Sequence, residues 1–272
     1  VQTTLNSMSL DEKIGQLFFP IAMSYEQEYL KNLVREFKPA GVIFRPGDRK
    51  EIIDAANSAQ LSADIPLLIA GNLESGGAGI VNGGTDFGSQ MQVAATGNTT
   101  TAEALGMLSS KEGKAVGCNI TFSPVIDIDF NPFNPITNVR TYGSNPDEVA
   151  SFGSSYIKSV QKNGVATSIK HFPGDGVDFR DQHFAISENN MTPQQWDDSY
   201  GKVYEACINA GTLTLMAGHI TLPKYSKAIN PSLSEEEIFP ASLSYELMTC
   251  LLREKLGFNG LIISDASDMV EK

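Results

Sequence analysis

Short runs of apolar residues recur along this chain, and longer segments of mixed apolar and polar residues separate them. The runs do not alternate strictly between apolar and polar positions, which is typical of strands covered on both faces of a sheet. We therefore expect seven strands with helices between them. The expected strands cover residues 16–19, 41–44, 66–70, 120–125, 166–169, 212–216 and 260–263.

Helix boundaries can be predicted in several of the intervening segments. A capping box, in which two side chains three positions apart bond to each other's backbone N–H groups, marks the start of a helix. The segment from Tyr245 to Leu256 has leucines near helical spacing and ends before Gly257, a residue that favours helix ends. The pairs with capping-box spacing are Ser9 with Glu12, Ser24 with Gln27, and Thr192 with Gln195.

Continuous alternation of strands and helices predicts an α/β fold with a parallel sheet, either open or closed as a (β/α)8 TIM-type barrel. No Gly-x-Gly-x-x-Gly segment follows the first strand, which disfavours a dinucleotide-binding open sheet. We expect the barrel, as one domain over residues 1–272. Only seven strands can be counted, so either the first strand is misread or the last strand-helix unit is missing. We expect the missing unit to be supplied by a C-terminal segment of the same polypeptide or from elsewhere.

Composition narrows the kinds of partner. The net charge of -12 argues against nucleic acid, which binds to basic surfaces. Every uninterrupted apolar run is shorter than the roughly 18 residues that suggest a membrane span. Cys118, Cys207 and Cys250 are widely spaced and odd in number, which argues against a disulfide framework or a zinc cluster and for buried free thiols. The acidic charge and unpaired cysteines favour the cytoplasm, with secretion or surface attachment as the alternative.

Polar residues follow five of the expected strands, at the end where barrel enzymes place their active sites. Any one of them could be a helix cap or a core residue, but together they indicate a shared site. The chain has no His-Glu-x-x-His, phosphate-binding loop or Gly-x-Ser-x-Gly segment. Carboxylates, histidines, a lysine and an arginine suit the hydrolysis of a polar substrate such as a sugar. These residues are Asn72, Glu74, Asp127, Arg140, Lys170, His171, His219 and Asp265.

Four segments resemble motifs of the family 3 glycoside hydrolases, specifically the β-N-acetylhexosaminidase branch. Residues 170–183, KHFPGDGVDFRDQH, are similar to that branch's KHFPGHG…D-x-H segment. Residues 122–143 resemble its PVxD…R-x-[FY]-G region, and residues 240–269 resemble the helix and strand that end in GFxGxIxSDxxxM. The loop of residues 72–77 resembles its D-H-E-G-G loop. The motifs occur in the family's order along nearly the whole chain.

The resemblance implies a retaining exo-β-N-acetylglucosaminidase that acts on cell-wall or chitin-type fragments, as in peptidoglycan recycling, without a metal or organic cofactor. Asp265 would be the nucleophile that forms a covalent glycosyl-enzyme intermediate. Asp181 and His183 would be the acid/base pair on a mobile loop. Histidine exchanges protons near neutral pH, and a carboxylate bonded to its ring holds the tautomer. The implied substrate-binding residues are Asn72, Glu74, Arg140, Lys170, His171 and His219, and Asp127 would orient Arg140 or Lys170.

Several positions depart from the pattern of the branch. Ser75 resembles an insertion before the Gly pair, and Ala78 lies where Arg often follows. Asn72 stands where the family has Asp, so the side chain loses a charge and gains a donor. Asp175 replaces a histidine, and the sequence offers no reason for this change. Three alternatives stay open: a β-glucosidase, which the D-x-H pair disfavours; a glycoside phosphorylase, because a histidine repels an incoming phosphate less than a carboxylate would; and an inactive sugar-binding fragment.

Overall fold

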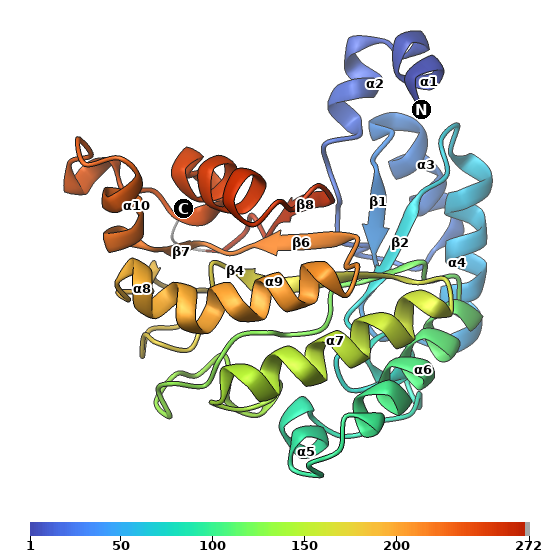
Figure 1. Cartoon of the computed structure of the whole chain (residues 1–272). Coiled ribbons are helices and arrows are strands. Elements are labelled where there is room, and N and C mark those ends of the chain that lie inside the picture. The colour runs from blue at the N-terminus through green and yellow to red at the C-terminus, as the bar shows by residue number, and fades with distance from the viewer. Residues whose placement is uncertain (270–272) are drawn as a thin grey trace.

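The computed structural model describes residues 1–269 and shows helices packed on the outside of a curled parallel sheet (Figure 1). The sheet has six strands in the order β1-β2-β3-β4-β6-β8. Neighbouring strands in this order pair in parallel, so the sheet has the curvature and connectivity of part of a TIM-type barrel. The strands are β1 (Gly41–Ile43), β2 (Leu68–Gly71), β3 (Ile120–Thr121), β4 (Ala166–Phe172), β6 (Thr214–Ala217) and β8 (Leu261–Ser264).

Helices α4, α6, α7 and α9 cover the outer face, while α1 and α2 stand at one end of the molecule (Figure 1). A separate pair of short parallel strands, β5 (Ser187–Glu188) and β7 (Ile220–Thr221), was not expected from the sequence. The α-helices are α1 (Gln2–Ser7), α2 (Leu10–Gly15), α3 (Gln27–Phe37), α4 (Arg49–Ser62), α5 (Gln90–Ala94), α6 (Thr100–Ala115), α7 (Pro146–Lys162), α8 (Pro193–Trp196), α9 (Lys202–Asn209) and α10 (Pro223–Ile229). The 3-10 and π-helices are η1 (Gly77–Gly79), η2 (Asn138–Arg140), η3 (Asp197–Gly201), η4 (Glu235–Glu237), η5 (Ala241–Leu243) and η6 (Glu246–Lys255).

Two of the three expected capping boxes are confirmed. Those at the starts of α2 and α8 have both reciprocal hydrogen bonds. The box expected at Ser24 is wrong, because α3 is capped at Glu26 and Ser24 Oγ accepts from the Glu26 N–H instead. The helix expected before Gly257 forms as η6, and Gly257 has the positive φ of 67° that ends such a helix.

The first expected strand does not form. Gln16 ends α2, and its side-chain amide donates to the Lys38 carbonyl oxygen at 2.7 Å. Further along, only Ile21 forms a single bridge to Ile43 of β1. The Pro20 carbonyl oxygen accepts from the Ile43 N–H at 3.0 Å, and the Ala22 N–H donates to the Ile43 carbonyl oxygen at 2.9 Å, so the pairing with β1 lies at residues 20–22, beyond the expected run. The sheet is thus a partial barrel over residues 1–269, and the count of eight strands stays a prediction.

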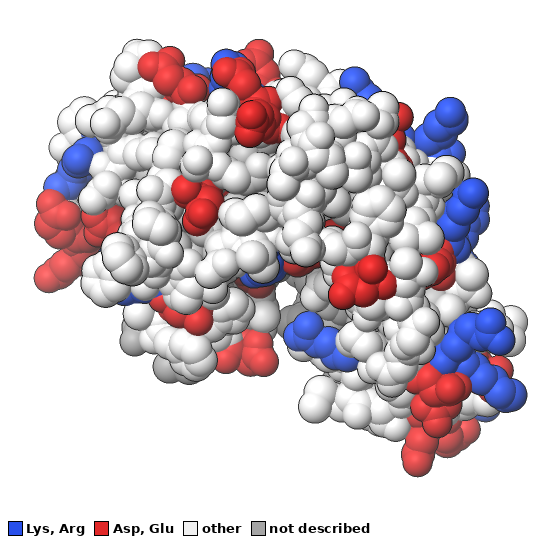
Figure 2. All heavy atoms as spheres, turned by 90° about the horizontal axis from the view of Figure 1, so that it is seen from below, with Lys and Arg blue, Asp and Glu red and all other residues white. Residues whose placement is uncertain are grey.

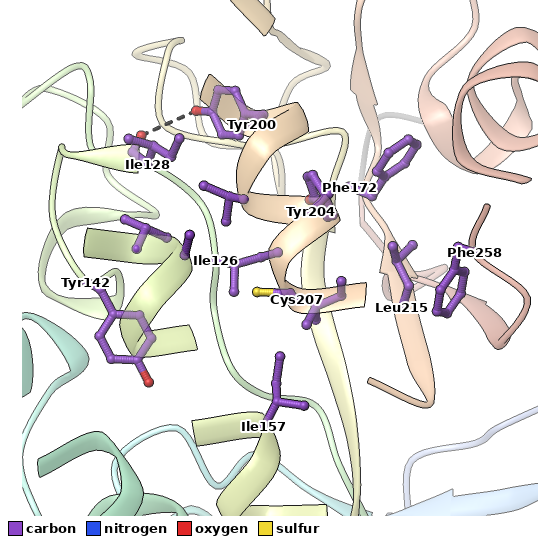
Figure 3. Packing of buried hydrophobic residues seen from close by; sticks show 14 of the residues in the cluster. Ile126, Ile128, Tyr142, Ile157, Phe172, Tyr200, Tyr204, Cys207, Leu215 and Phe258 are labelled. Atoms are coloured by element: carbon purple, nitrogen blue, oxygen red, sulfur yellow. Dashed lines mark hydrogen bonds between the residues drawn. The ribbon is translucent and has the colours of Figure 1, made fainter. Parts of the chain in front are cut away.

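The largest core lies between the sheet and helices α7 and α9 (Figure 3). Trp196 is fully buried, donates from Nε1 to the Pro173 carbonyl oxygen at 2.8 Å, and meets the Phe172 ring edge to face. The Tyr200 hydroxyl reaches the Ile128 carbonyl oxygen at 3.3 Å. These contacts anchor the polypeptide that follows β4, which carries much of the charged segment found in the sequence.

The surface carries charges of both signs, and two of the three cysteines are buried as expected. Figure 2 shows a face on which Lys and Arg side chains lie among Asp and Glu side chains, without one basic patch on the described residues of this face. Cys118 and Cys207 are buried and Cys250 is partly exposed, and all are free thiols. Within residues 1–269, no helix has both the length and the apolar character needed to cross a membrane.

Asp175 stands where the family pattern has a histidine, and it joins the turn after β4 to the loop after β3. Its Oδ1 accepts from Asn134 Nδ2 at 2.8 Å and from the Gly176 N–H at 2.7 Å. Its own N–H donates to Asp127 Oδ1 at 2.8 Å. Its Oδ2 is buried and has no hydrogen-bond partner in the described part of the chain. Burial, together with the charge of Asp127, raises the pKa of Asp175 to about 6.

We predict that the unfolding free energy of the Asp175→Asn variant rises relative to that of wild type as the pH rises. The folded-state pKa of about 6 lies above the value of about 3.9 for an unfolded chain, so the Asp175 proton favours folding at low pH and this contribution is lost as the pH rises through about 6. Asparagine does not titrate. The difference in unfolding free energy, variant minus wild type, should therefore increase by on the order of 2 kcal/mol between about pH 4.5 and about pH 7.5.

Urea unfolding at both pH values, followed by the fluorescence of Trp196, measures this difference. Asp147→Asn is the matched control, the same change at a side chain that is 70% exposed. A difference for Asp175→Asn that is equal at the two pH values would contradict the raised pKa.

Candidate active site

The carboxyl ends of β2, β4 and β8 bring several of the expected site residues together. Glu74 follows β2, Lys170 and His171 lie near the end of β4, and Asp265 follows β8. Parallel strands present their carboxyl ends on one side of the sheet, where barrel enzymes bind their substrates. Arg140 reaches the same place from η2, in the long loop after β3.

Glu74 binds two cations. Its Oε1 accepts from Lys170 Nζ at 2.6 Å and from Arg140 Nη2 at 2.9 Å, and its Oε2 accepts from Arg140 Nε at 3.0 Å. The Lys170 side chain is only 4% exposed, so its charge depends on this partner. The three side chains together carry one more positive than negative charge.

The pKa values of these groups reflect burial and mutual charge. Burial alone would raise the pKa of Glu74, but the charges of Lys170 and Arg140 outweigh it and hold that pKa well below its usual range. Burial lowers the pKa of Lys170, although the Glu74 carboxylate opposes this shift. Burial also acts against the charge of Arg140, but its hydrogen bonds with Glu74 leave its pKa raised. Glu74 is therefore ionised across the physiological range.

His171 connects a fully buried carboxylate to Asp265. Its Nδ1 lies 2.6 Å from Asp127 Oδ2, and its backbone N–H donates to Asp127 Oδ1 at 3.0 Å. Its Nε2 lies 4.0 Å from Asp265 Oδ2. The expectation that Asp127 orients Arg140 or Lys170 is corrected here, because both Asp127 oxygens bind the His171 residue. The reason is geometric. Asp127 is 0% exposed and lies under the turn that begins at His171, so His171 is the residue within its reach.

Asp265 is a mostly buried carboxylate that stays charged. Its N–H donates to the Ala217 carbonyl oxygen at 2.8 Å, which continues the pairing of β8 with β6. Its Oδ1 accepts from the Ala266 N–H at 2.7 Å. Burial alone would raise the pKa of Asp265, but the nearby His171 and Lys170 charges and the Ala266 N–H lower it overall. Its Oδ2 has no hydrogen bond within residues 1–269 and is therefore available to a ligand.

His219 follows β6 and lies beside the backbone that carries Asp265. Its Nε2 is 3.1 Å from the Ala266 carbonyl oxygen, which can only accept a hydrogen, and its Nδ1 is 2.8 Å from Ser242 Oγ. The ring thus donates from Nε2, and both of its nitrogens already have protein partners. Asn72, two residues before Glu74, is partly exposed, and its side chain makes no hydrogen bond with the described residues.

Asp181 and His183 lie on a loop after β4. His183 Nδ1 is 2.7 Å from Asp181 Oδ1, and the His183 N–H donates to the same oxygen at 2.8 Å. The His183 side chain is 47% exposed. Gln182 between them is fully buried, and its Oε1 lies 3.3 Å from the point where a Cβ on Gly218 would stand, as does His171 Cβ. Gln182 therefore places this loop next to the carboxyl end of β4.

Several residues around the site were missed from the sequence. Ser242, Asn134 and Asp178 hold His219, Asp175 and the loop of His183, respectively. Asp178 lies inside the charged segment and could have been noticed there, whereas Ser242 has no signal in the sequence. Within residues 1–269, no group of three or more His, Cys, Asp or Glu side chains is placed to hold a metal ion.

Known proteins resemble this chain in sequence and in structure. An enzyme from Cellulomonas fimi named β-N-acetylglucosaminidase/β-glucosidase is 45% identical over 269 residues, which cover 99% of this chain and 48% of the relative. The structure of the β-glucoside phosphorylase BglX bound to 2FGlc matches with a TM-score of 0.96 at 47% identity, covering 99% of this chain and 49% of that one.

A family 3 β-N-acetylglucosaminidase from Paenibacillus sp. str. FPU-7 matches with a TM-score of 0.89 at 28% identity, covering 97% of this chain and 50% of that one. The chain thus spans about half the length of these relatives. The sequence profile described as "Glycosyl hydrolase family 3 N terminal domain" matches residues 9–272. The chain therefore belongs to glycosyl hydrolase family 3, and the resemblance of its motifs to that family is confirmed.

Proposed function

We propose that this protein is a retaining glycosidase that removes terminal β-linked N-acetylglucosamine from cell-wall or chitin-type fragments. The observation that carries the proposal is Asp265, an ionised and mostly buried carboxylate whose Oδ2 is available to a ligand. Glu74 is the other ionised carboxylate at this edge, but both of its oxygens are bound by Arg140 and Lys170. The names of relatives from Cellulomonas fimi and Paenibacillus support this substrate class.

In the first step, Asp265 Oδ2 attacks the anomeric carbon while the bond from that carbon to the leaving oxygen breaks. His183 donates its proton to the leaving oxygen, and Asp181 stabilises the imidazolium before transfer. The result is a sugar esterified to Asp265. In the second step, neutral His183 removes a proton from water, the water oxygen attacks the anomeric carbon, and the ester bond breaks. Two inversions retain the configuration of the sugar.

The remaining site residues hold the sugar. Arg140, Lys170 and the His171 ring can donate hydrogen bonds to hydroxyl or acetamido oxygens, and Glu74 can accept from hydroxyl groups. Contacts close to the reacting carbon strengthen as positive charge develops in the transition state. Asn72 would accept from a hydroxyl group on the far side of the ring. His219 would hold the backbone beside Asp265.

We also propose that the active protein has the complete (β/α)8 barrel. Strand β8 is an edge of the sheet over residues 1–269, and Leu261 on it is 47% exposed. An uncovered parallel edge leaves backbone groups unpaired and lets water reach the carboxylate of Asp265. Closure of the barrel would pair these backbone groups and exclude water from Asp265.

Replacing the nucleophile tests the mechanism. We expect Asp265→Asn to lower kcat for a 4-nitrophenyl N-acetyl-β-glucosaminide by about a thousandfold or more, because an amide cannot form the ester intermediate. Asp147→Asn, an exposed aspartate on α7, should keep wild-type activity. Circular dichroism checks that both variants fold. Activity of Asp265→Asn close to wild type would rule out the assigned nucleophile.

Wild-type rates on paired substrates test the sugar. We compare kcat/KM for the 4-nitrophenyl N-acetyl-β-glucosaminide with that for the matching β-glucoside. Faster cleavage of the glucoside would overturn the N-acetyl assignment and leave the reaction class intact.

Phosphorolysis is a second candidate for the same site, favoured by a specific observation. The candidate acid/base His183 is an imidazole, which as a neutral base does not repel an anion. Lys170 and Arg140 add positive charge near Asp265. In this version a phosphate oxygen, already deprotonated, attacks the anomeric carbon of the Asp265 ester and releases a sugar 1-phosphate. The similarity to a β-glucoside phosphorylase supports the idea.

Phosphate decides between the two reactions. If the protein is a phosphorylase, millimolar phosphate should raise kcat by about tenfold or more and convert the released sugar into its 1-phosphate, because breakdown of the ester is then the accelerated step. If it is a hydrolase, the free sugar should form at a rate independent of phosphate. Sulfate at equal ionic strength is the control for salt effects, and product analysis by NMR identifies the sugar.

A further inference from the structure

We propose that Asp178 is a positioning residue for proton transfer. Its carboxylate closes the base of the loop of residues 179–187, which carries Asp181 and His183, and so sets where His183 stands relative to the leaving oxygen. The inference rests on the proposed function, which makes His183 the acid/base.

One carboxylate joins the two ends of this loop. Asp178 Oδ2 accepts from the Glu188 N–H at 2.8 Å, ten positions along the chain. The same oxygen accepts from Arg180 Nε at 2.7 Å, and Oδ1 accepts from the Arg180 N–H at 3.1 Å. The Asp178 side chain is 5% exposed, whereas His183, midway between the two ends, is 47% exposed. The buried base of the loop is therefore separate from its accessible catalytic part.

Both ends of the loop are attached to rigid parts of the fold. The Asp178 carbonyl oxygen accepts from Asn134 Nδ2 at 2.7 Å, which ties it to the loop after β3. Glu188 belongs to β5, which pairs with β7, and the following Asn189 N–H donates to the Thr221 carbonyl oxygen at 2.9 Å. The carboxylate of Asp178 connects these two attachments and so sets the separation of the loop ends.

The catalytic part of the loop has few polar contacts of its own with the barrel. Within residues 1–269, His183 bonds to Asp181, and the Asp181 carbonyl oxygen accepts from the N–H groups of Phe184 and Ala185. All of these contacts are internal to the loop. Gln182 is buried, but neither atom of its amide has a hydrogen-bond partner in the described chain. The position of His183 therefore depends on packing of Gln182 and on how the base of the loop is held.

The charge of Asp178 suits this task. Burial alone would raise its pKa, but the hydrogen bonds from Arg180 and from the Glu188 N–H lower it overall, so the group stays ionised. An ionised carboxylate accepts from all of these donors at once. An asparagine in its place would turn one oxygen into an NH2 group that faces other N–H donors. The loop base would then open, while the barrel and Asp265 would be left in place.

The test uses Asp178→Asn in the full-length protein and two substrates that share one sugar. A 2,4-dinitrophenyl glycoside leaves without a proton, whereas an alkyl glycoside needs one from His183. We expect kcat/KM for the alkyl glycoside to fall by about tenfold to a hundredfold, the size of effect typical of a misplaced acid, and the dinitrophenyl value to change by less than about twofold. Asp64→Asn, with a side chain that is 85% exposed, is the matched control and should match wild type on both substrates.

Each outcome is decisive. Equal losses on both substrates would mean that Asp178 only supports the fold, and no loss on either would mean that it does not position the loop. His183→Ala separates this inference from the proposed function. If that variant also loses equal activity on the alkyl and the dinitrophenyl glycoside, the acid/base assignment is wrong. If His183→Ala shows the dependence and Asp178→Asn does not, only the positioning role fails. Should Asp178→Asn not fold, Asp178→Glu shifts the carboxylate by one methylene and is read in the same way.

Discussion

The ion pair between Lys170 and Glu74 is the contact on which the site depends. An isolated charge at a buried position costs several kcal/mol, and a close partner of opposite charge offsets most of this cost. Glu74 follows β2 and Lys170 lies on β4, so the pair forms only when both strands stand in register on either side of β3. Arg140, from the loop after β3, completes the group. The order of the sheet and the charge of the site are therefore linked.

A second buried carboxylate organises the neighbouring turn. Asp127 receives hydrogen bonds from the His171 backbone and from the Asp175 backbone, and its other oxygen faces the His171 ring. This arrangement directs the far nitrogen of His171 towards Asp265. Asp265 is mostly buried and yet ionised, because the charges of His171 and Lys170 and the Ala266 N–H outweigh the effect of burial on its pKa. The same surroundings suit a carboxylate that meets a developing oxocarbenium ion.

The candidate acid/base differs from the rest of the site. Lys170 is paired with Glu74 and His171 is held by the buried Asp127, whereas His183 is held through its loop. A position on a loop suits a group that must approach and leave a substrate oxygen, because a loop can move without disturbing the sheet. In the proposed mechanism, the barrel would hold the sugar rigidly and the loop would supply the proton.

The sequence by itself determined what depends on local pattern. Apolar runs marked six strands because strands buried on both faces need them, and the polar residues after those runs marked the edge where Glu74, Lys170 and Asp265 meet. The pairing of Asp181 with His183 was also predictable, since the two residues are only two positions apart. The family could be inferred from the order of its motifs.

Only the tertiary structure decided the contacts between distant segments. Asp127 binds His171, 44 positions away, and Asp175 binds Asn134, 41 positions away, and neither choice of partner has a local signal. The apolar run at residues 16–19 does not form a strand, because Leu17 and Phe18 donate their N–H groups back to the carbonyl oxygens of Ile14 and Gly15 and so continue the turn that ends α2. Pattern determines which residues are buried or polar, but a buried charge selects its partner only when the folded chain has brought the candidates together.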